Sequence, residues 1–127
     1  DLGASLLATG FPYDLRTSPV NNLGHWGRFI VRAQAIRRCG SAALDLSYVA
    51  CGRFDGFWEL KLKPWDVAAG ALIVAEAGGR VSDFRGAEFA LEAPGILATN
   101  GRIHQEMFDV LARDGMAGGT DGPDDRT

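Results

Sequence analysis

Two acidic residues near the middle of the chain, Glu59 and Asp66, are the first candidates for chemistry. Glu59 lies in an alternating stretch that predicts a strand, and Asp66 lies in the first turn of an apolar stretch that predicts a helix. Because the strand leads directly into the helix, both carboxylates can reach one crevice. Carboxylate oxygens are the ligands that Mg²⁺ prefers, and they also act as fixed acceptors for substrate hydroxyl groups.

Both acids also have ordinary structural explanations. Asp66 could satisfy free N–H groups at the start of its helix and complement the helix dipole. Glu59 could form a cross-strand ion pair with a lysine or an arginine. A buried carboxylate must in any case be hydrogen-bonded, paired or metal-bound, because an isolated buried charge is very costly. The residue pattern alone leaves these alternatives open.

A third candidate is the junction Gly40-Ser41-Ala42, which opens a predicted helix over 42–50 with Ser41 as its N-cap. The free N–H groups of such a helix start favour bound anions or sugar hydroxyls. Many helices begin with Gly-Ser, so this signal is weak by itself. Asp45, one turn further along, is interpreted as a residue of the helix surface or of an ion pair.

The longest predicted helix covers residues 64–79. Pro64 suits its first position, and Gly78-Gly79 can adopt the left-handed conformation that ends a helix. Nearly every side chain between these ends is apolar, on all faces, which predicts a central helix covered on every side. About 12 apolar positions are too few to span a bilayer, which needs about 20.

The remaining pattern alternates strands with helices and favours an α/β layered fold. The strand over 54–62 is predicted to be half-buried, and the last helix to bury Ile103, Met107, Val110 and Leu111. Residues 1–113 form one predicted domain, and 114–127 a disordered tail. Further predicted strands cover 5–9, 35–38, 80–84 and 95–98, and further helices cover 22–32 and 102–113.

Composition narrows the possible partners. The chain of 127 residues is 46% hydrophobic and 23% charged, with a formal net charge of −3. This charge gives no electrostatic case for nucleic acid or membrane partners. Cys39 and Cys51 flank the helix over 42–50 and would lie roughly 18 Å apart, too far for a disulfide. We therefore expect two free, packed thiols in a reducing cytoplasm.

Four further polar residues carry weaker signals. His25 has no acid or second histidine nearby in the sequence, so it is interpreted as a surface or helix-packing residue, and His104 is interpreted in the same way. Arg37 and Arg38 could meet a second anionic group of a substrate or a partner subunit. A solvated basic pair explains them equally well.

Specific motifs then resemble a known family. The run Trp65-Asp66-x-Ala68-Ala69-Gly70, followed by Glu76-Ala77-Gly78-Gly79, resembles the C-terminal signature of the inositol monophosphatase family. The segments 40–46 and 54–59 stand at the family's spacing upstream, and 8–13 is similar to bacterial-type members. The resemblance covers about residues 4 to 112, and its two main motifs are together very specific.

The resemblance implies a Mg²⁺-dependent, lithium-sensitive phosphatase of small phosphorylated alcohols, with a layered α-β-α-β-α fold. This chain would supply the C-terminal half. By the motif match Asp66 is a metal ligand, and no residue here is assigned as catalytic. A cytoplasmic homodimer acting on inositol monophosphate or a related polyol phosphate is expected. The substrate-binding residues implied in the same way are Gly40, Ser41, Ala42, Glu59 and Asp66.

The family's other metal ligands lie in a Glu-Glu segment and an Asp-Pro-x-Asp-Gly-Thr motif, and neither occurs in this sequence. The chain also starts at Asp1 without a methionine. We therefore expect a portion that is inactive without a missing N-terminal half. The alternative is a non-catalytic α/β interaction or dimerisation module. The substrate stays open among inositol phosphates, fructose bisphosphate, histidinol phosphate and adenosine bisphosphates.

Overall fold

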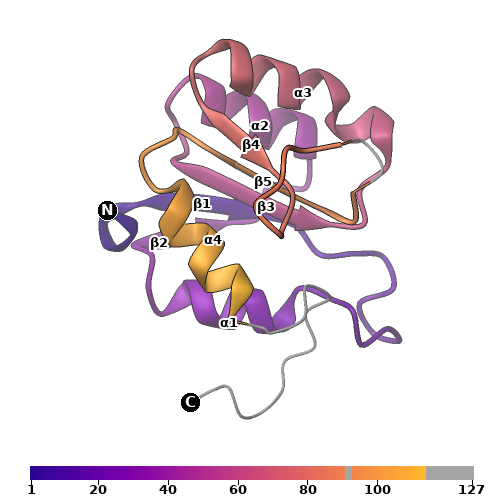
Figure 1. The fold of residues 1–127 in the computed structure, drawn as a ribbon. Helices are drawn as coiled ribbons and strands as arrows, with labels where there is room; N and C mark the ends of the chain where they lie inside the picture. The colour runs from indigo at the N-terminus through magenta and orange to yellow at the C-terminus, as the bar shows by residue number, and fades with distance from the viewer. Residues whose placement is uncertain (91–92, 114–127) are drawn as a thin grey trace.

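The computed structural model describes residues 1–90 and 93–113, and its centre is a five-stranded sheet with helices on both faces. Figure 1 shows α2 and α3 on one face of the sheet and α1 and α4 on the other. A short 3₁₀ helix over Leu2–Ala4 precedes the sheet. The strands are β1 (Leu6–Thr9), β2 (Ala35–Arg37), β3 (Gly56–Leu60), β4 (Arg80–Ser82) and β5 (Gly95–Thr99), and the helices are α1 (Leu23–Ile30), α2 (Ala42–Ala50), α3 (Pro64–Glu76) and α4 (His104–Ala112).

The strand order across the sheet is β2-β1-β3-β5-β4. β1 pairs in parallel with both β2 and β3, while β5 pairs antiparallel with β3 and with β4. The last strand in the chain therefore fills the position between β3 and β4. The predicted order of elements and the α/β layered class are confirmed.

Each face of the sheet has its own apolar core. The core beneath α1 and α4 is built around Trp58, Phe29 and Met107, and the core beneath α2 and α3 around Phe57, Leu46 and Val74. β3 contributes alternate side chains to both cores, so all its residues except Glu59 are buried. The prediction of a half-buried strand is wrong because helices cover both faces of this central strand.

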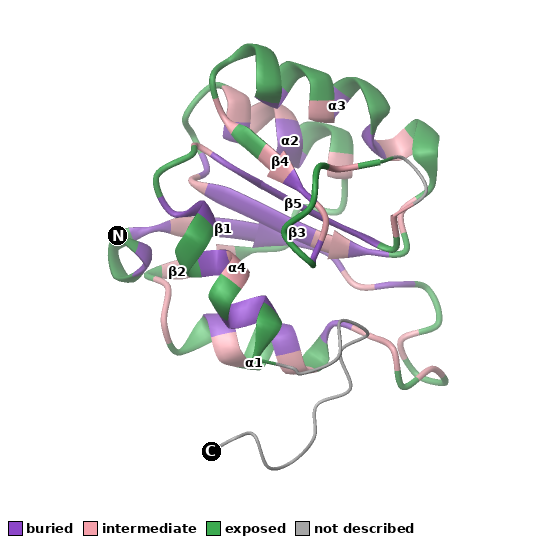
Figure 2. Ribbon diagram, in the orientation of Figure 1, coloured by how far each residue is buried: buried purple, intermediate pink, exposed green. Residues whose placement is uncertain are grey.

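The predicted ends of α3 are confirmed, but its predicted surroundings are wrong. Pro64 occupies the first turn, and Gly78, with a φ of 91°, follows the C-cap. Only Val67, Gly70 and Val74 are buried along the helix. Figure 2 shows its outer side exposed, because the structure places only α2 and the sheet against it. The large apolar side chains that remain exposed there are Trp65, Leu72 and Ile73.

Local capping signals act as predicted at several points. The Ser41 hydroxyl accepts a hydrogen bond from the backbone N–H of Leu44, which caps α2. α4 buries the four apolar residues expected of it.

Both cysteines are free as predicted, yet both are exposed, so the expectation that they are packed is wrong. The predicted tail over 114–127 lies outside the described residues.

Within the described ranges no helix has both the length and the apolar character needed to cross a bilayer.

Candidate functional site

A pocket opens at the edge of the sheet where the parallel strands β1, β2 and β3 end. The chain leaves β1 toward α1 on one face of the sheet, and it leaves β2 toward α2 on the opposite face. Such a divergence of loops creates a crevice outside the carboxyl ends of the strands, where α/β proteins bind ligands. The pocket here has a volume of about 420 Å³.

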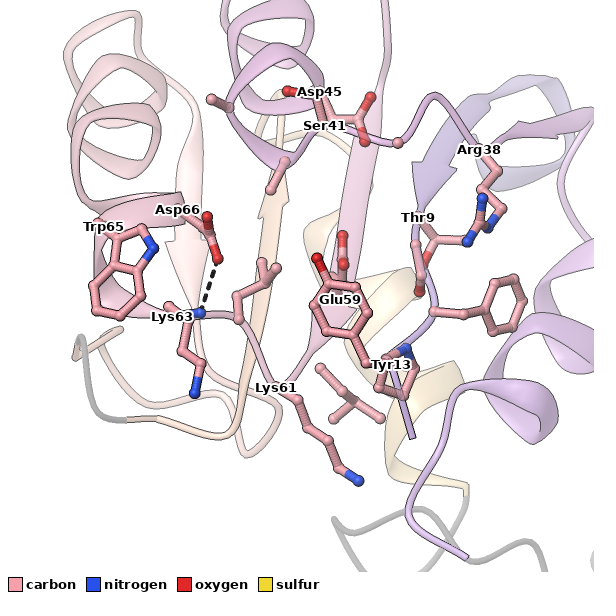
Figure 3. A pocket seen from close by; sticks show the side chains of 18 residues that line it. Thr9, Tyr13, Arg38, Ser41, Asp45, Glu59, Lys61, Lys63, Trp65 and Asp66 are labelled. Atoms are coloured by element: carbon pink, nitrogen blue, oxygen red, sulfur yellow. Dashed lines mark hydrogen bonds between the residues drawn. The ribbon is translucent and has the colours of Figure 1, made fainter. Parts of the chain in front are cut away.

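All five sequence-predicted site residues line this one pocket. Gly40, Ser41 and Ala42 come from the start of α2, Glu59 from β3 and Asp66 from the first turn of α3. In Figure 3 Glu59 lies between Asp66 on one side and Thr9 with Arg38 on the other. The remaining lining residues are Thr9, Gly10, Phe11, Pro12, Tyr13, Arg38, Ala43, Asp45, Leu60, Lys61, Leu62, Lys63 and Trp65.

The Asp66 carboxylate is partly used by its own helix. Its Oδ2 accepts a hydrogen bond of 3.1 Å from the backbone N–H of Lys63, which satisfies one free donor at the start of α3. Within the described residues its Oδ1 makes no protein hydrogen bond, and no arginine pairs with the group. Asp66 therefore acts as a helix cap and also presents an oxygen to the pocket.

Glu59 has no cross-strand cation in the sheet. Its partner in the register of β5 is Ile96, so the cross-strand ion pair considered from the sequence does not form. Burial raises the pKa of Glu59 to about 7, with the charges of Asp45 and Asp66 adding to the effect and Arg38 opposing it. Near neutral pH this carboxyl group can therefore donate or accept a hydrogen bond.

Asp45 corrects an interpretation from the sequence. It is not on the helix surface: its side chain is only 1% exposed, and it lines the pocket beneath the start of α2. Burial raises the pKa of Asp45 to about 6, and a hydrogen bond with Cys39 acts in the opposite direction. One carboxyl oxygen, Oδ1, has no hydrogen-bond partner among the described residues. Sequence reasoning missed this residue because nothing beside it in the sequence marks it as part of a pocket.

Basic side chains complete the pocket wall. Arg38 follows β2 and lies over the Phe11 ring, with 5.6 Å between its Cζ atom and the ring centre. Lys61 follows β3 with a φ of 62°, and its Nζ donates to both carboxylate oxygens of Asp14, at 3.0 and 2.8 Å. The Lys61 ion pair ties the loop after β1 to the end of β3. Arg37, by contrast, is exposed and does not line the pocket.

The two histidines lie outside the pocket. His25 is buried and packs edge-on against Phe84, with ring centres 5.3 Å apart. His104 is buried between two hydroxyls, with Ser82 Oγ 2.8 Å from Nε2 and Thr99 Oγ1 2.9 Å from Nδ1. Each histidine was interpreted from the sequence as either a surface or a helix-packing residue, and the structure shows both buried and packed.

These residues do not make a metal site by themselves. Among residues 1–90 and 93–113 no group of three His, Cys, Asp or Glu side chains is placed to hold an ion. Asp66 suits one coordination position for Mg²⁺, which takes six oxygen ligands. The described donor set therefore does not complete a magnesium site, although it can bind hydroxyl groups and anions.

Comparison with known proteins places this geometry in a family. Residues 1–115 match the inositol monophosphatase family. An inositol-1-monophosphatase of Synechocystis sp. is 50% identical over 111 residues, which are 87% of this chain and 39% of that protein. The Nus factor SuhB of Escherichia coli K12 is 47% identical over 108 residues, 85% of this chain and 40% of that protein. The chain thus spans about two-fifths of these curated relatives.

A solved structure agrees with the sequence relatives. The inositol monophosphatase of Anabaena (Nostoc) sp. superimposes with a TM-score of 0.86 at 46% sequence identity. The match covers 89% of this chain and 45% of that one. In fold as in sequence, the chain belongs to the inositol monophosphatase family.

Proposed function

We propose that the chain forms the substrate-binding part of a Mg²⁺-dependent phosphatase that acts on a small polyol phosphate. The single observation that carries the proposal is that the residues of two separate motifs, 40–42 and 59–66, meet in one pocket. They come from the start of α2, from β3 and the segment after it, and from the first turn of α3. Family membership supports phosphate-ester hydrolysis as the reaction class.

The pocket's own groups divide the work of binding. The Glu59 carboxyl group orients substrate hydroxyls, because its raised pKa lets it act as donor or acceptor near neutral pH. The N–H groups at the start of α2 and the guanidinium of Arg38 attract an anionic group. A polyol that carries a phosphate offers both kinds of partner.

Among the described residues, Asp66 is the one that we assign to magnesium. When bound, Mg²⁺ would neutralise phosphate oxygens, and Asp66 would hold one of its coordination positions. The further ligands would come from the rest of the enzyme. The described residues therefore bind and orient substrate but do not hydrolyse it.

The exposed side of α3 indicates where that remainder packs. Trp65, Leu72 and Ile73 are exposed on α3, and Leu44 is exposed on α2, the helix that packs against it. A large apolar patch on a folded domain marks an interaction surface. Since the chain spans about two-fifths of its relatives, we assign this surface to the part of the family fold that the chain does not match.

The test combines this chain with a polypeptide that carries the part of the Synechocystis enzyme outside the matched region. We expect Mg²⁺-dependent release of phosphate from inositol monophosphate by the pair and none by either piece. Asp66→Asn should lower kcat at least about 100-fold, and Glu59→Gln should raise KM about tenfold. Asp83→Asn, a turn residue outside the pocket, is the matched control.

A pair that assembles yet hydrolyses neither inositol phosphates nor other sugar phosphates would overturn the proposal. Inhibition by lithium and a homodimer of the assembled enzyme are further expectations from the family. Each is checked on the same preparation, by assays with LiCl and by light scattering.

A second candidate is a non-catalytic interaction module. It is favoured by relatives with 47% identity that carry the name Nus factor. This alternative predicts that Asp66→Asn and Glu59→Gln leave partner binding unchanged, whereas charged substitutions on the exposed side of α3 abolish it.

A further inference from the structure

Gly10 lies against the carboxyl group of Glu59. β1 and β3 pair in parallel with Thr9 opposite Trp58, so the next residues along, Gly10 and Glu59, are neighbours at the pocket floor. A Cβ atom at Gly10 would lie 2.7 Å from both Oε1 and Oε2 of Glu59 and 2.8 Å from its Cδ. The carboxyl group therefore occupies the space that any side chain at position 10 would fill.

Backbone conformation does not explain the glycine. Gly10 is not one of the residues with a positive φ, so an alanine could adopt its backbone angles. The three nearest atoms that a Cβ at position 10 would meet all belong to the Glu59 carboxyl group. Glycine is needed here for close approach, not for a turn.

The backbone of Gly10 is itself held in place. Asn22, fully buried, donates from Nδ2 to the Gly10 carbonyl at 2.8 Å and to Thr9 Oγ1 at 2.9 Å. Its Oδ1 accepts from the indole N–H of Trp58 at 2.6 Å, and the Thr9 hydroxyl donates to the Trp58 carbonyl. The amide thus links the strand residues that precede Gly10 and Glu59.

This ring of buried hydrogen bonds makes the position of Gly10 relative to Glu59 stiff. All the polar groups of the buried Asn22 side chain are used in these hydrogen bonds, and breaking any one leaves a costly unpaired group. A side chain added at position 10 could not be relieved by movement of the backbone. The Glu59 carboxyl group would have to turn away.

We propose that Gly10 is a positioning residue for Glu59: it fixes the direction in which the carboxyl oxygens face the substrate hydroxyls. The inference rests on the proposed function, in which Glu59 contacts substrate. The effect of Gly10 on the direction of the Glu59 carboxyl group can be tested separately from that function, because it can be measured without turnover.

The test compares Gly10→Ala with Gly27→Ala in the full chain. A Cβ at Gly27 meets nothing within 4 Å, so this variant controls for the substitution itself. Nuclear magnetic resonance of ¹³C-labelled glutamate follows the Glu59 carboxyl carbon, which is identified by its loss in Glu59→Gln. We expect Gly10→Ala to move its titration midpoint by about one pH unit and Gly27→Ala by less than about 0.2.

A second variant deals with the case in which Gly10→Ala does not fold. Glu59→Asp shortens the side chain by one methylene and withdraws the carboxyl group from position 10. If Gly10→Ala/Glu59→Asp folds where Gly10→Ala does not, the contact is confirmed. If neither folds, or if Gly10→Ala folds with the Glu59 signal unchanged, the proposal is wrong.

Kinetics of the assembled enzyme tests the link to substrate. Gly10→Ala should raise KM for the polyol phosphate about tenfold with a smaller change in kcat, and Gly27→Ala should change neither. An unchanged KM overturns the positioning role. Absence of turnover in the unmutated pair counts against the proposed function instead, and the resonance experiment still decides the contact between Gly10 and Glu59.

Discussion

The pocket contains two carboxyl groups with raised pKa values, the partly buried Glu59 and the buried Asp45, and their placement favours binding at a cost in stability. Each is placed where water is scarce, and Asp45 adds to the rise in the pKa of Glu59. A folded chain therefore holds protons that the unfolded chain would release. Groups arranged in this way are common at functional sites, where stability is lower than the sequence could achieve.

Replacing Glu59 by glutamine should stabilise the chain at alkaline pH. The ordinary pKa is 4.5 and the folded value about 7, so the folded state binds more protons between these values and loses stability as pH rises through them. Glu59→Gln removes this loss. We expect a gain of about 1–2 kcal/mol at pH 8 and little change at pH 4.5. Urea unfolding at both pH values measures it.

Glu76 is exposed, so Glu76→Gln serves as control, and its effect on the free energy of unfolding should be the same at both pH values. An equal effect of Glu59→Gln at pH 4.5 and pH 8 would contradict the assigned burial of the carboxyl group.

His104 should give the opposite pH dependence. Burial, with a smaller effect of Arg80, lowers its pKa from 6.5 to about 4. The unfolded chain binds the extra proton between these values, so the histidine contributes a loss of stability as pH falls from 6.5 toward 4. His104→Ala should cost about 2–4 kcal/mol at pH 7, because it leaves Ser82 and Thr99 short of a partner.

The pH profile separates this effect from simple loss of packing. In His104→Ala the stability lost between pH 6.5 and pH 4 should shrink, whereas in the exposed neighbour Gln105→Ala it should match the unmutated chain. A profile unchanged by His104→Ala would sink the explanation.

At the scale of elements, α2 and α3 meet through a glycine. A Cβ at Gly70 would lie 2.8 Å from the Cβ and 2.6 Å from the Cδ1 of Leu46. Gly70→Ala should therefore destabilise the chain by about 1–3 kcal/mol despite the better helix propensity of alanine. Gly27→Ala in α1, where space is open, should instead be neutral or stabilising by up to about 1 kcal/mol. Thermal unfolding of both variants decides; a stable Gly70→Ala would mean that the helices can separate.

The ends of the helices were predictable because their signals are local. Ser41, Pro64 and Gly78 act on backbone groups within a few residues, so the sequence beside them is sufficient. The faces of the helices were not predictable in the same way. The outer side of α3 was assigned to a core, yet Trp65, Leu72 and Ile73 are exposed on it in the structure.

The residues of the site also differ in how far the sequence predicts them. Glu59 and Asp66 stand seven residues apart and were predicted to share a crevice, which they do. Gly10 and Asp45 gave no such signal. Gly10 reaches Glu59 through strand pairing, and Asp45 is buried where the start of α2 meets the pocket. Only the topology brings these residues to the pocket.

At the scale of the whole molecule, the exposed apolar side of α3 governs how the chain behaves alone. Leu72→Gln/Ile73→Gln should reduce binding of a hydrophobic dye and self-association, with a loss of stability below about 0.5 kcal/mol, because both positions are already in water. Dye fluorescence and sedimentation measure the two effects. Leu97→Gln, in the core, is the contrast and should unfold the chain. Undiminished dye binding in the double variant would show that the surface lies elsewhere.

The place of β5 in the sheet also constrains how the protein is made. β3 is paired on its second edge by a strand that is synthesised 35 residues after its own last residue. Among the strands that the structure describes, β4 pairs with that strand alone, and one isolated bridge joins its Ser82 to Glu88. Until that strand leaves the ribosome, two hydrogen-bonding edges stay open in the nascent polypeptide. Premature termination between residues 82 and 95 would thus release a species in which β3 and β4 lack the strand that pairs with both, and such a species is prone to aggregate.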